Sequence, residues 1–193
     1  MTFVEPVSET DGAEYYGRLR ESLGLVPNYA LPFSLNPAVL FAWQGLLGSI
    51  KATMDPRRYE LVTIAAARQL RSSYCMLAHG SVLLENHLDA ETLRAAATDH
   101  HAAGLDAVDV AVMDLAEKVA TDATSVTQDD VDNLRGLGLT DAEVFDVVAA
   151  AAARCFLTKV VDGLGARPDA SYADLEPSEL REALTVGRPI AES

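Results

Sequence analysis

Apolar residues recur at helical spacing along most of the chain. Between Asp106 and Thr121, for example, Val108, Val112 and Leu115 share one face of a helix. The alternation of β-branched and polar residues that is typical of strands never persists, whereas Ala, Leu, Glu and Arg dominate long stretches. The pattern therefore predicts an all-α protein.

Capping residues and prolines indicate where the helices begin. Asp55 followed by Pro56 is typical of a helix start, and so are Thr127 and Thr140, each followed three residues later by an acidic residue. Ser72 or Ser73 is expected to cap the next helix after Pro56. The predicted helices run from Ser8 to about Leu23, Pro37 to about Lys51, Asp55 to about Leu70, Tyr74 to His87, Asp89 to about His100, Asp106 to Thr121, onward from Thr127, Asp141 to about Leu164, and Ser178 to Leu184, with Leu25–Asn36 as a connecting segment.

These helices predict a single domain over residues 1–193, with a core at about 20–168 and a C-terminal arm at about 169–193. A chain of this length can bury a sizeable core without disulfides or metals. Nearly every face of the 141–164 helix is small and apolar, which is typical of a helix at the centre of a bundle or in a subunit interface. We expect a homo-oligomer, with the arm packed on a neighbouring subunit.

The charge and composition exclude several classes of function. The net charge of −14 repels phosphate backbones, which argues against nucleic-acid binding and against an anionic membrane surface. No apolar run is long enough for a membrane span, and the first ten residues have no secretory pattern, so a cytoplasmic protein is expected. In that compartment Cys75 and Cys155 are not expected to form a disulfide. The four histidines are scattered, and neither a metal nor a cofactor site is predicted.

The strongest candidate for chemistry is the pair Cys75 and His79. Cys75 falls in the first turn of a predicted helix, where free N–H groups and the helix dipole favour a thiolate. His79 follows four residues later, so its imidazole lies on the same face and can move a proton to or from the thiol or a substrate. The alternative is an ordinary buried cysteine next to a structural histidine.

Glu60 is the candidate carboxylate for this pair. It lies near the start of the preceding predicted helix. If the two helices are antiparallel, Glu60 is at the far end from Cys75. If the helices cross steeply or the chain loops back, the carboxylate can reach the pair. Both geometries are compatible with the sequence.

These residues resemble the active-site stretch of a known family. Glu60, followed by Ser72-x-Tyr74-Cys75-x-x-x-His79, is similar to the pattern of the AhpD-like alkylhydroperoxidases of the carboxymuconolactone decarboxylase superfamily, in which a Glu precedes C-x-x-C-x-x-x-H. The resemblance covers roughly residues 20 to 170 and is closest to the uncharacterised peroxidase-related branch. It also includes Asp114-Leu-Ala-Glu-Lys-Val, Ser125-Val-Thr, Gly138-Leu-Thr-Asp-Ala-Glu-Val, Val161-Asp-Gly-Leu-Gly and Pro168-Asp169.

The resemblance implies an all-helical AhpD-like bundle that assembles as a dimer, trimer or hexamer. It also implies a thiol-dependent hydroperoxide reductase with Cys75 as the nucleophile, His79 and Glu60 as a proton relay, and Tyr74 shaping the pocket. The implied partners are a small hydroperoxide or a small carboxylated substrate, together with an external thiol reductant.

The first cysteine of the family pattern is Ser72 in this chain. A hydroxyl cannot form a disulfide, so an external thiol, or Cys155 if it lies close, would have to reduce an oxidised Cys75. Two alternatives stay open. One is a non-redox enzyme of the decarboxylase type that uses Glu60 and His79 as acid and base, and the other is a non-catalytic oligomeric binding protein.

The other polar and aromatic residues singled out in the sequence are expected to have structural rather than catalytic roles. Arg57 and Arg58 are expected in surface ion pairs, and Arg154, inside an apolar helix, is expected to need a carboxylate or an interface. Cys155 is interpreted as a buried structural cysteine. The remaining expectations are solvated histidines at His87, His100 and His101, and core or pocket-wall positions for Trp43 and Tyr59.

Overall fold

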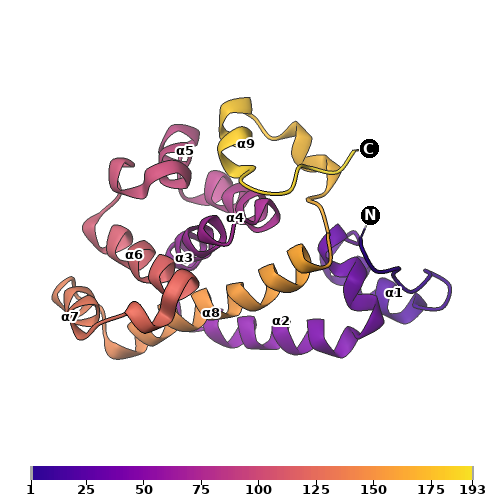
Figure 1. The fold of residues 1–193 in the computed structure, drawn as a ribbon, viewed down its shortest axis with the longest axis horizontal. Coiled ribbons are helices and arrows are strands. Elements are labelled where there is room, and N and C mark those ends of the chain that lie inside the picture. Colours follow the sequence, from indigo (N-terminus) through magenta and orange to yellow (C-terminus); the bar gives the residue numbers. More distant parts are fainter. Residues whose placement is uncertain (1, 193) are drawn as a thin grey trace.

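The computed structural model describes residues 2–192 and shows a bundle of helices (Figure 1). Residues 1 and 193, the ends of the predicted domain, lie outside that range. No strand occurs within residues 2–192, so the all-α class is confirmed. The α-helices are α1 (Ala13–Leu23), α2 (Pro37–Lys51), α3 (Pro56–Gln69), α4 (Ser73–Asn86), α5 (Ala90–Asp99), α6 (Ala107–Asp122), α7 (Gln128–Gly136), α8 (Asp141–Gly163) and α9 (Ser178–Leu184), with 3-10 turns η1 (Asn28–Leu35), η2 (His100–Ala102), η3 (Ala123–Ser125) and η4 (Ala170–Asp174).

Helix α3 lies at the centre of the bundle. The Asp55 carboxylate accepts the N–H of Arg58 at 2.9 Å, and Pro56 takes the first helical position, as the sequence predicted. Every residue from 59 to 67 is buried, because α3 packs against α4, α6 and α8 at once. A polar side chain on any face of this stretch is therefore surrounded by protein rather than by solvent.

Helix α8 is the longest helix and carries one wall of the candidate site. Thr140 and Glu143 form the predicted capping box, in which the Glu143 carboxylate accepts the N–H of Thr140 at 2.8 Å. α8 runs alongside α2, and it also packs on α3 and α6 (Figure 1). The face of α8 turned away from these neighbours leaves Phe145 and Phe156 exposed by 69% and 43%.

Two local predictions, both of helix caps, were wrong. Ser8 does not cap α1, because its hydroxyl bonds to Asp11 in a preceding turn and the helix starts after Gly12. Neither Ser72 nor Ser73 caps α4 with its side chain. The Ser73 hydroxyl instead accepts the N–H of Gly187 at 2.8 Å, a contact that links α4 to the C-terminal segment. The expected connection between the first two helices is largely a 3-10 helix, η1.

The C-terminal arm folds back on its own chain, and its expected contact with a neighbouring subunit stays a prediction. Leu180 and Leu184 on α9 are fully buried against α4 and α5. At Gly80 an added Cβ would lie 2.8 Å from a methyl carbon of Leu184, so the glycine permits the close approach of α9 to α4. The arm therefore belongs to the core of the described chain.

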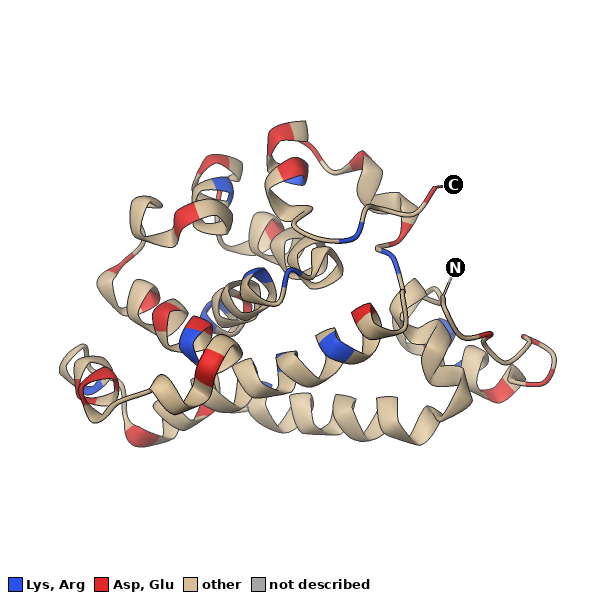
Figure 2. Ribbon diagram, viewed as in Figure 1, with Lys and Arg blue, Asp and Glu red and all other residues tan. Residues whose placement is uncertain are grey.

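The surface of the bundle is unevenly charged. Helix α2 carries no charged residue before Lys51 at its end, and most of its ribbon is free of charge colouring in Figure 2. Leu46 on α2 is 51% exposed. None of the helices within residues 2–192 is long and apolar enough to cross a membrane.

We expect the exposed aromatic residues of α8 to lie in a contact between subunits, since solvent-exposed phenylalanines of this size are commonly found in interaction surfaces. Light scattering on the wild-type protein should give a multiple of 20.6 kDa. The double variant Phe145→Lys/Phe156→Lys should shift towards the monomer, whereas Phe3→Lys, which changes an exposed phenylalanine elsewhere, should not. A monomeric wild type at every concentration would exclude this interface.

Candidate functional site

A cavity of about 470 Å³ opens between α2, α3, α4, α8 and the segment after α8. Its wall is mostly apolar and aromatic. The polar residues that line it are Tyr29, Gln44, Lys51, Tyr59, Tyr74, Cys75, His79, Arg154, Asp169, Ser171 and Tyr172. A volume of this size accepts a small organic molecule rather than a peptide or a nucleic acid.

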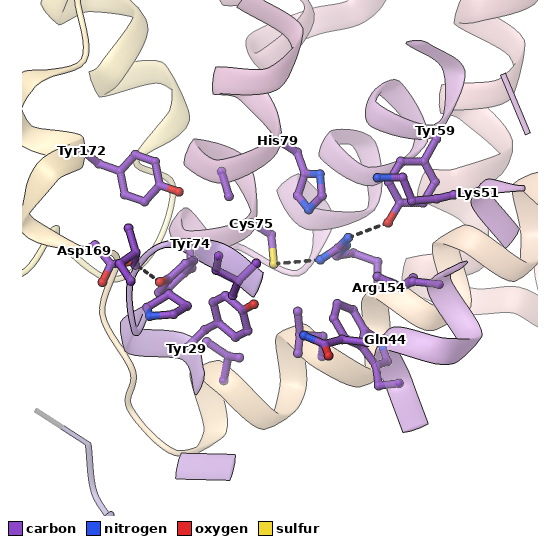
Figure 3. Close-up of a pocket in the computed structure, with 18 of the residues that line it drawn as sticks. Tyr29, Gln44, Lys51, Tyr59, Tyr74, Cys75, His79, Arg154, Asp169 and Tyr172 are labelled. Atoms are coloured by element: carbon purple, nitrogen blue, oxygen red, sulfur yellow. Dashed lines mark hydrogen bonds between the residues drawn. The ribbon is translucent and has the colours of Figure 1, made fainter. Parts of the chain in front are cut away.

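Cys75 lies on the cavity wall, in the first turn of α4, and is 3% exposed. Two side chains of α8, one helical turn apart, reach its sulfur. Thr158 Oγ1 lies 3.3 Å from Sγ, and Nη1 of Arg154 donates to Sγ at 3.7 Å. The sulfur is thus held between a hydroxyl and a guanidinium, as Figure 3 shows for Arg154.

Arg154 is buried, with 2% of its surface exposed. Its other terminal nitrogen donates to the Tyr59 hydroxyl at 3.2 Å, and the guanidinium also lies over the Trp43 ring. Burial acts to lower the pKa of Arg154, but its interactions with Cys75 and Tyr59 outweigh that effect and raise the pKa above its usual value. The arginine therefore stays charged inside the protein.

Glu60 and His79 meet behind the cavity wall. Nδ1 of His79 and Oε2 of Glu60 are 2.5 Å apart, and the Glu60 side chain is 6% exposed. The helices α3 and α4 thus adopt the geometry in which the carboxylate reaches the histidine. His79 lines the cavity beside Cys75, whereas Glu60 does not line it (Figure 3).

The protonation of His79 follows from its surroundings. Burial and the positive charge of Arg154 lower the pKa of His79 to about 4, although the Glu60 carboxylate acts in the opposite direction. The imidazole is therefore neutral near pH 7. When its proton is on Nδ1, that N–H can donate a hydrogen bond to the Glu60 carboxylate. That arrangement leaves the lone pair of Nε2 available as a base on the cavity side.

The opposite end of the cavity from Lys51 is built around Asp169 (Figure 3). Its carboxylate accepts the Asn28 N–H at 2.9 Å and the Tyr74 hydroxyl. Burial raises the pKa of Tyr172 to about 12, and burial together with the Asp169 bond raises the pKa of Tyr74. These phenols stay protonated at neutral pH, and the Tyr74 hydroxyl donates its proton to Asp169 in a hydrogen bond.

The remaining candidates are distributed as follows. Ser72 is fully buried and does not line the cavity, whereas Tyr74 does. Arg57 and Arg58 form ion pairs with Asp109, which is itself buried.

Cys155 is only partly buried and is not among the lining residues, so the cavity contains one cysteine. Trp43 and Tyr59 are buried and line the cavity, as predicted.

Two sequence interpretations need correction. Arg154 was expected to need a carboxylate or an interface, but within residues 2–192 its hydrogen bonds go to Cys75 and Tyr59 inside one chain. His100 was expected in solvent, but it is 2% exposed. Thr158 carried no signal in the sequence, because a single small hydroxyl residue in a helix indicates no particular contact. An arginine inside an apolar helix is itself a signal of a buried polar contact.

The fold is shared with solved structures. An uncharacterised peroxidase-related protein from Ralstonia eutropha JMP134, with an alkylhydroperoxidase AhpD core, superposes with a TM-score of 0.76 at 21% identity and covers 97% of this chain and 98% of that chain. A peroxidase-related protein from Silicibacter sp. TM1040 gives a TM-score of 0.75 at 20% identity, covering 89% and 91%. The debrominase Bmp8 in complex with 2,3,4-tribromopyrrole gives 0.71 at 17% identity, covering 95% and 96%.

The bundle thus places Cys75 and His79 on the wall of one cavity, with Glu60 behind it on the Nδ1 side of His79. Residues 37–118, which include all three side chains, match the carboxymuconolactone decarboxylase family. No curated protein matches the chain significantly. The family match over residues 37–118 and the shared fold together support an AhpD-like member of the carboxymuconolactone decarboxylase superfamily.

The low pKa of His79 predicts a loss of stability in acid. Between pH 6.5 and pH 4 the unfolded chain binds a proton at His79 and the folded chain does not, so the free energy of unfolding falls as the pH is lowered through this window. The loss from this residue is at most about 3 kcal/mol. Urea unfolding at pH 7, 5.5 and 4.5 should show a flatter pH dependence for His79→Gln than for the wild type.

The exposed His87 provides the control for this measurement, since His87→Gln should keep the wild-type pH dependence. If His79→Gln and the wild type have the same dependence, His79 does not have a lowered pKa in the folded state.

Proposed function

We propose that the protein is a thiol-dependent hydroperoxide reductase with Cys75 as its nucleophile. The observation that carries the proposal is the contact between the Arg154 guanidinium and the Cys75 sulfur, next to a neutral His79. A positive charge beside a cysteine favours the thiolate, which is the reactive form. Family membership supports a peroxidase-related or decarboxylase-type function, and the site favours the first of these.

The proposed reaction begins when Nε2 of His79 accepts the Cys75 thiol proton. The thiolate then attacks the terminal oxygen of the hydroperoxide, and an S–O bond forms while the O–O bond breaks. The departing alkoxide takes the proton from His79, which leaves an alcohol and the sulfenic acid of Cys75. Glu60 holds the imidazole through Nδ1 and stabilises its charged form during the transfer.

The second half of the reaction needs a thiol that the cavity does not contain. Ser72 cannot form a disulfide, and Cys155 lies outside the cavity. An external thiol would displace water from the sulfenic acid and form a mixed disulfide with Cys75. A second thiol would then release Cys75 and leave as the oxidised disulfide.

A second candidate is supported by the positive charges in the cavity. Lys51 and Arg154 both line it, and within the described chain their cation contacts are with Tyr59 and Trp43 rather than with carboxylates. Such a pair favours a substrate with a carboxylate. A decarboxylase-type enzyme that uses Glu60 and His79 as base and acid would exploit the same cavity without Cys75 chemistry.

The cavity argues against the third alternative, a binding protein without catalysis, because its reactive groups converge on one accessible space. A fold alone does not decide between activities. The substrate panel should therefore include organic hydroperoxides, carboxylated lactones and, because Bmp8 binds it, 2,3,4-tribromopyrrole.

We expect a low dose of cumene hydroperoxide to produce sulfenic acid at Cys75, trapped by dimedone and located by mass spectrometry. Cys155 should remain unmodified, since it lies outside the cavity and burial raises the pKa of its thiol. Peroxide turnover with a thiol reductant should disappear in Cys75→Ser and persist in Cys155→Ser. Full peroxidase activity in Cys75→Ser would exclude the proposal, and lactone turnover that survives thiol alkylation but is lost in His79→Ala would establish the second candidate.

We also expect Arg154 to control the reactivity of Cys75. Replacing it by methionine keeps much of its volume but removes the charge, so alkylation of Cys75 by iodoacetamide at pH 7 should slow by about tenfold or more. Arg154→Lys should retain part of the rate, and Arg135→Met, a change on the exposed face of α7, should leave it unchanged. Equal rates in wild type and Arg154→Met would show that the contact does not activate the sulfur.

A further inference from the structure

A second group of polar side chains converges away from the cavity, where η2 meets α6. Nε2 of His100 lies 2.8 Å from Oδ1 of Asp114, and Nε2 of His101 lies 2.9 Å from the same oxygen. The three atoms lie within 4.8 Å of one another. None of the three residues lines the cavity, so this group does not take part in the reaction proposed above.

The three side chains offer a set of atoms that can bind a metal ion. Two imidazole nitrogens and a carboxylate oxygen are three of the ligands that Zn²⁺ and related ions take in proteins. In a tetrahedral site with bonds of about 2.0–2.1 Å, neighbouring ligand atoms lie roughly 3.3 Å apart. The observed separations between each Nε2 and the carboxylate oxygen need to widen by only a few tenths of an ångström to admit the ion.

The buried histidine gives independent support. The side chain of His100 is 3% exposed, and its second nitrogen, Nδ1, has no hydrogen-bond partner within residues 2–192. Oε1 of Glu117 lies 3.8 Å from Nδ1 and 3.7 Å from Nη1 of Arg68, and within the same part of the chain it accepts no hydrogen bond. When Nε2 of a histidine binds a metal, its proton stays on Nδ1, and a carboxylate commonly accepts it. Glu117 is in place for that role.

The outer side of the group is open. His101 and Asp114 have side chains that are 59% and 44% exposed, so an ion can enter from solvent and keep a water as its fourth ligand. The net charge of −14 also attracts cations to this protein. Imidazole ligands favour Zn²⁺, Co²⁺, Ni²⁺ and Cu²⁺ over Mg²⁺ and Ca²⁺.

We propose that His100, His101 and Asp114 bind one divalent cation of the zinc type, with Glu117 supporting His100. No metal site was expected from the sequence, because two adjacent histidines have none of the spacings of known zinc motifs. The bound ion would tie η2 to α6 and so fix the connection between α5 and α6.

The proposal can be tested with tag-free, full-length protein. Titration with Co²⁺, followed by visible absorption, should show one saturable equivalent per chain, and Zn²⁺ should displace it. His101→Ala and Asp114→Asn should each weaken Zn²⁺ binding by at least about tenfold in calorimetry. His87→Ala removes an exposed histidine elsewhere and should leave the affinity unchanged.

Thermal unfolding gives a second measurement. Saturating Zn²⁺ should raise the Tm of the wild type by a few degrees and should not raise that of His101→Ala. Both substituted side chains are exposed, and circular dichroism will verify that the variants are folded. The proposal is overturned by the absence of saturable binding, by unchanged affinity in His101→Ala, or by loss of binding in Cys75→Ser, which would locate the ion in the cavity instead.

Discussion

The guanidinium of Arg154 carries a positive charge into the interior of the bundle, where hydrogen bonds to Cys75 and Tyr59 hold it. Burying a charge is costly unless polar partners compensate for the lost water. The two partners here, the Cys75 thiol and the Tyr59 phenol, carry no charge when they are protonated. A thiolate at Cys75 would supply the negative charge that balances the buried guanidinium. The reactivity proposed for Cys75 and the retention of a charged arginine at this position therefore have the same physical cause.

The charge of Arg154 also affects the protonation of His79. Arg154 and burial together keep His79 neutral, while Glu60 orients the ring from the other side. A neutral imidazole with one nitrogen held by a carboxylate is a base on its free nitrogen. Under the proposed function two helices have separate tasks, since α8 supplies the Arg154 charge beside the sulfur and α3 supplies the Glu60 carboxylate that positions His79.

The position of Ser72 distinguishes this chain from the cysteine-pair pattern of the alkylhydroperoxidases that it resembles. Ser72 is buried and outside the cavity, and the other cysteine of the chain is outside it as well. Under the proposed function, the external thiol must reach Cys75 through the cavity itself. A volume of about 470 Å³ leaves room for such a molecule once the alcohol has departed.

Much of this protein was determined by local sequence. Helical periodicity gave the all-α class, and Asp55, Pro56, Thr140 and Glu143 set helix starts because their effects act over three or four residues. The pairing of Cys75 with His79 on one face of α4 is local for the same reason. Only the tertiary structure decided that α3 brings Glu60 to His79, that α8 brings Arg154 and Thr158 to the sulfur, and that the arm folds onto α4 and α5. Those contacts join residues that are distant in the chain, and they depend on how helices cross, which the periodicity of any single helix does not specify.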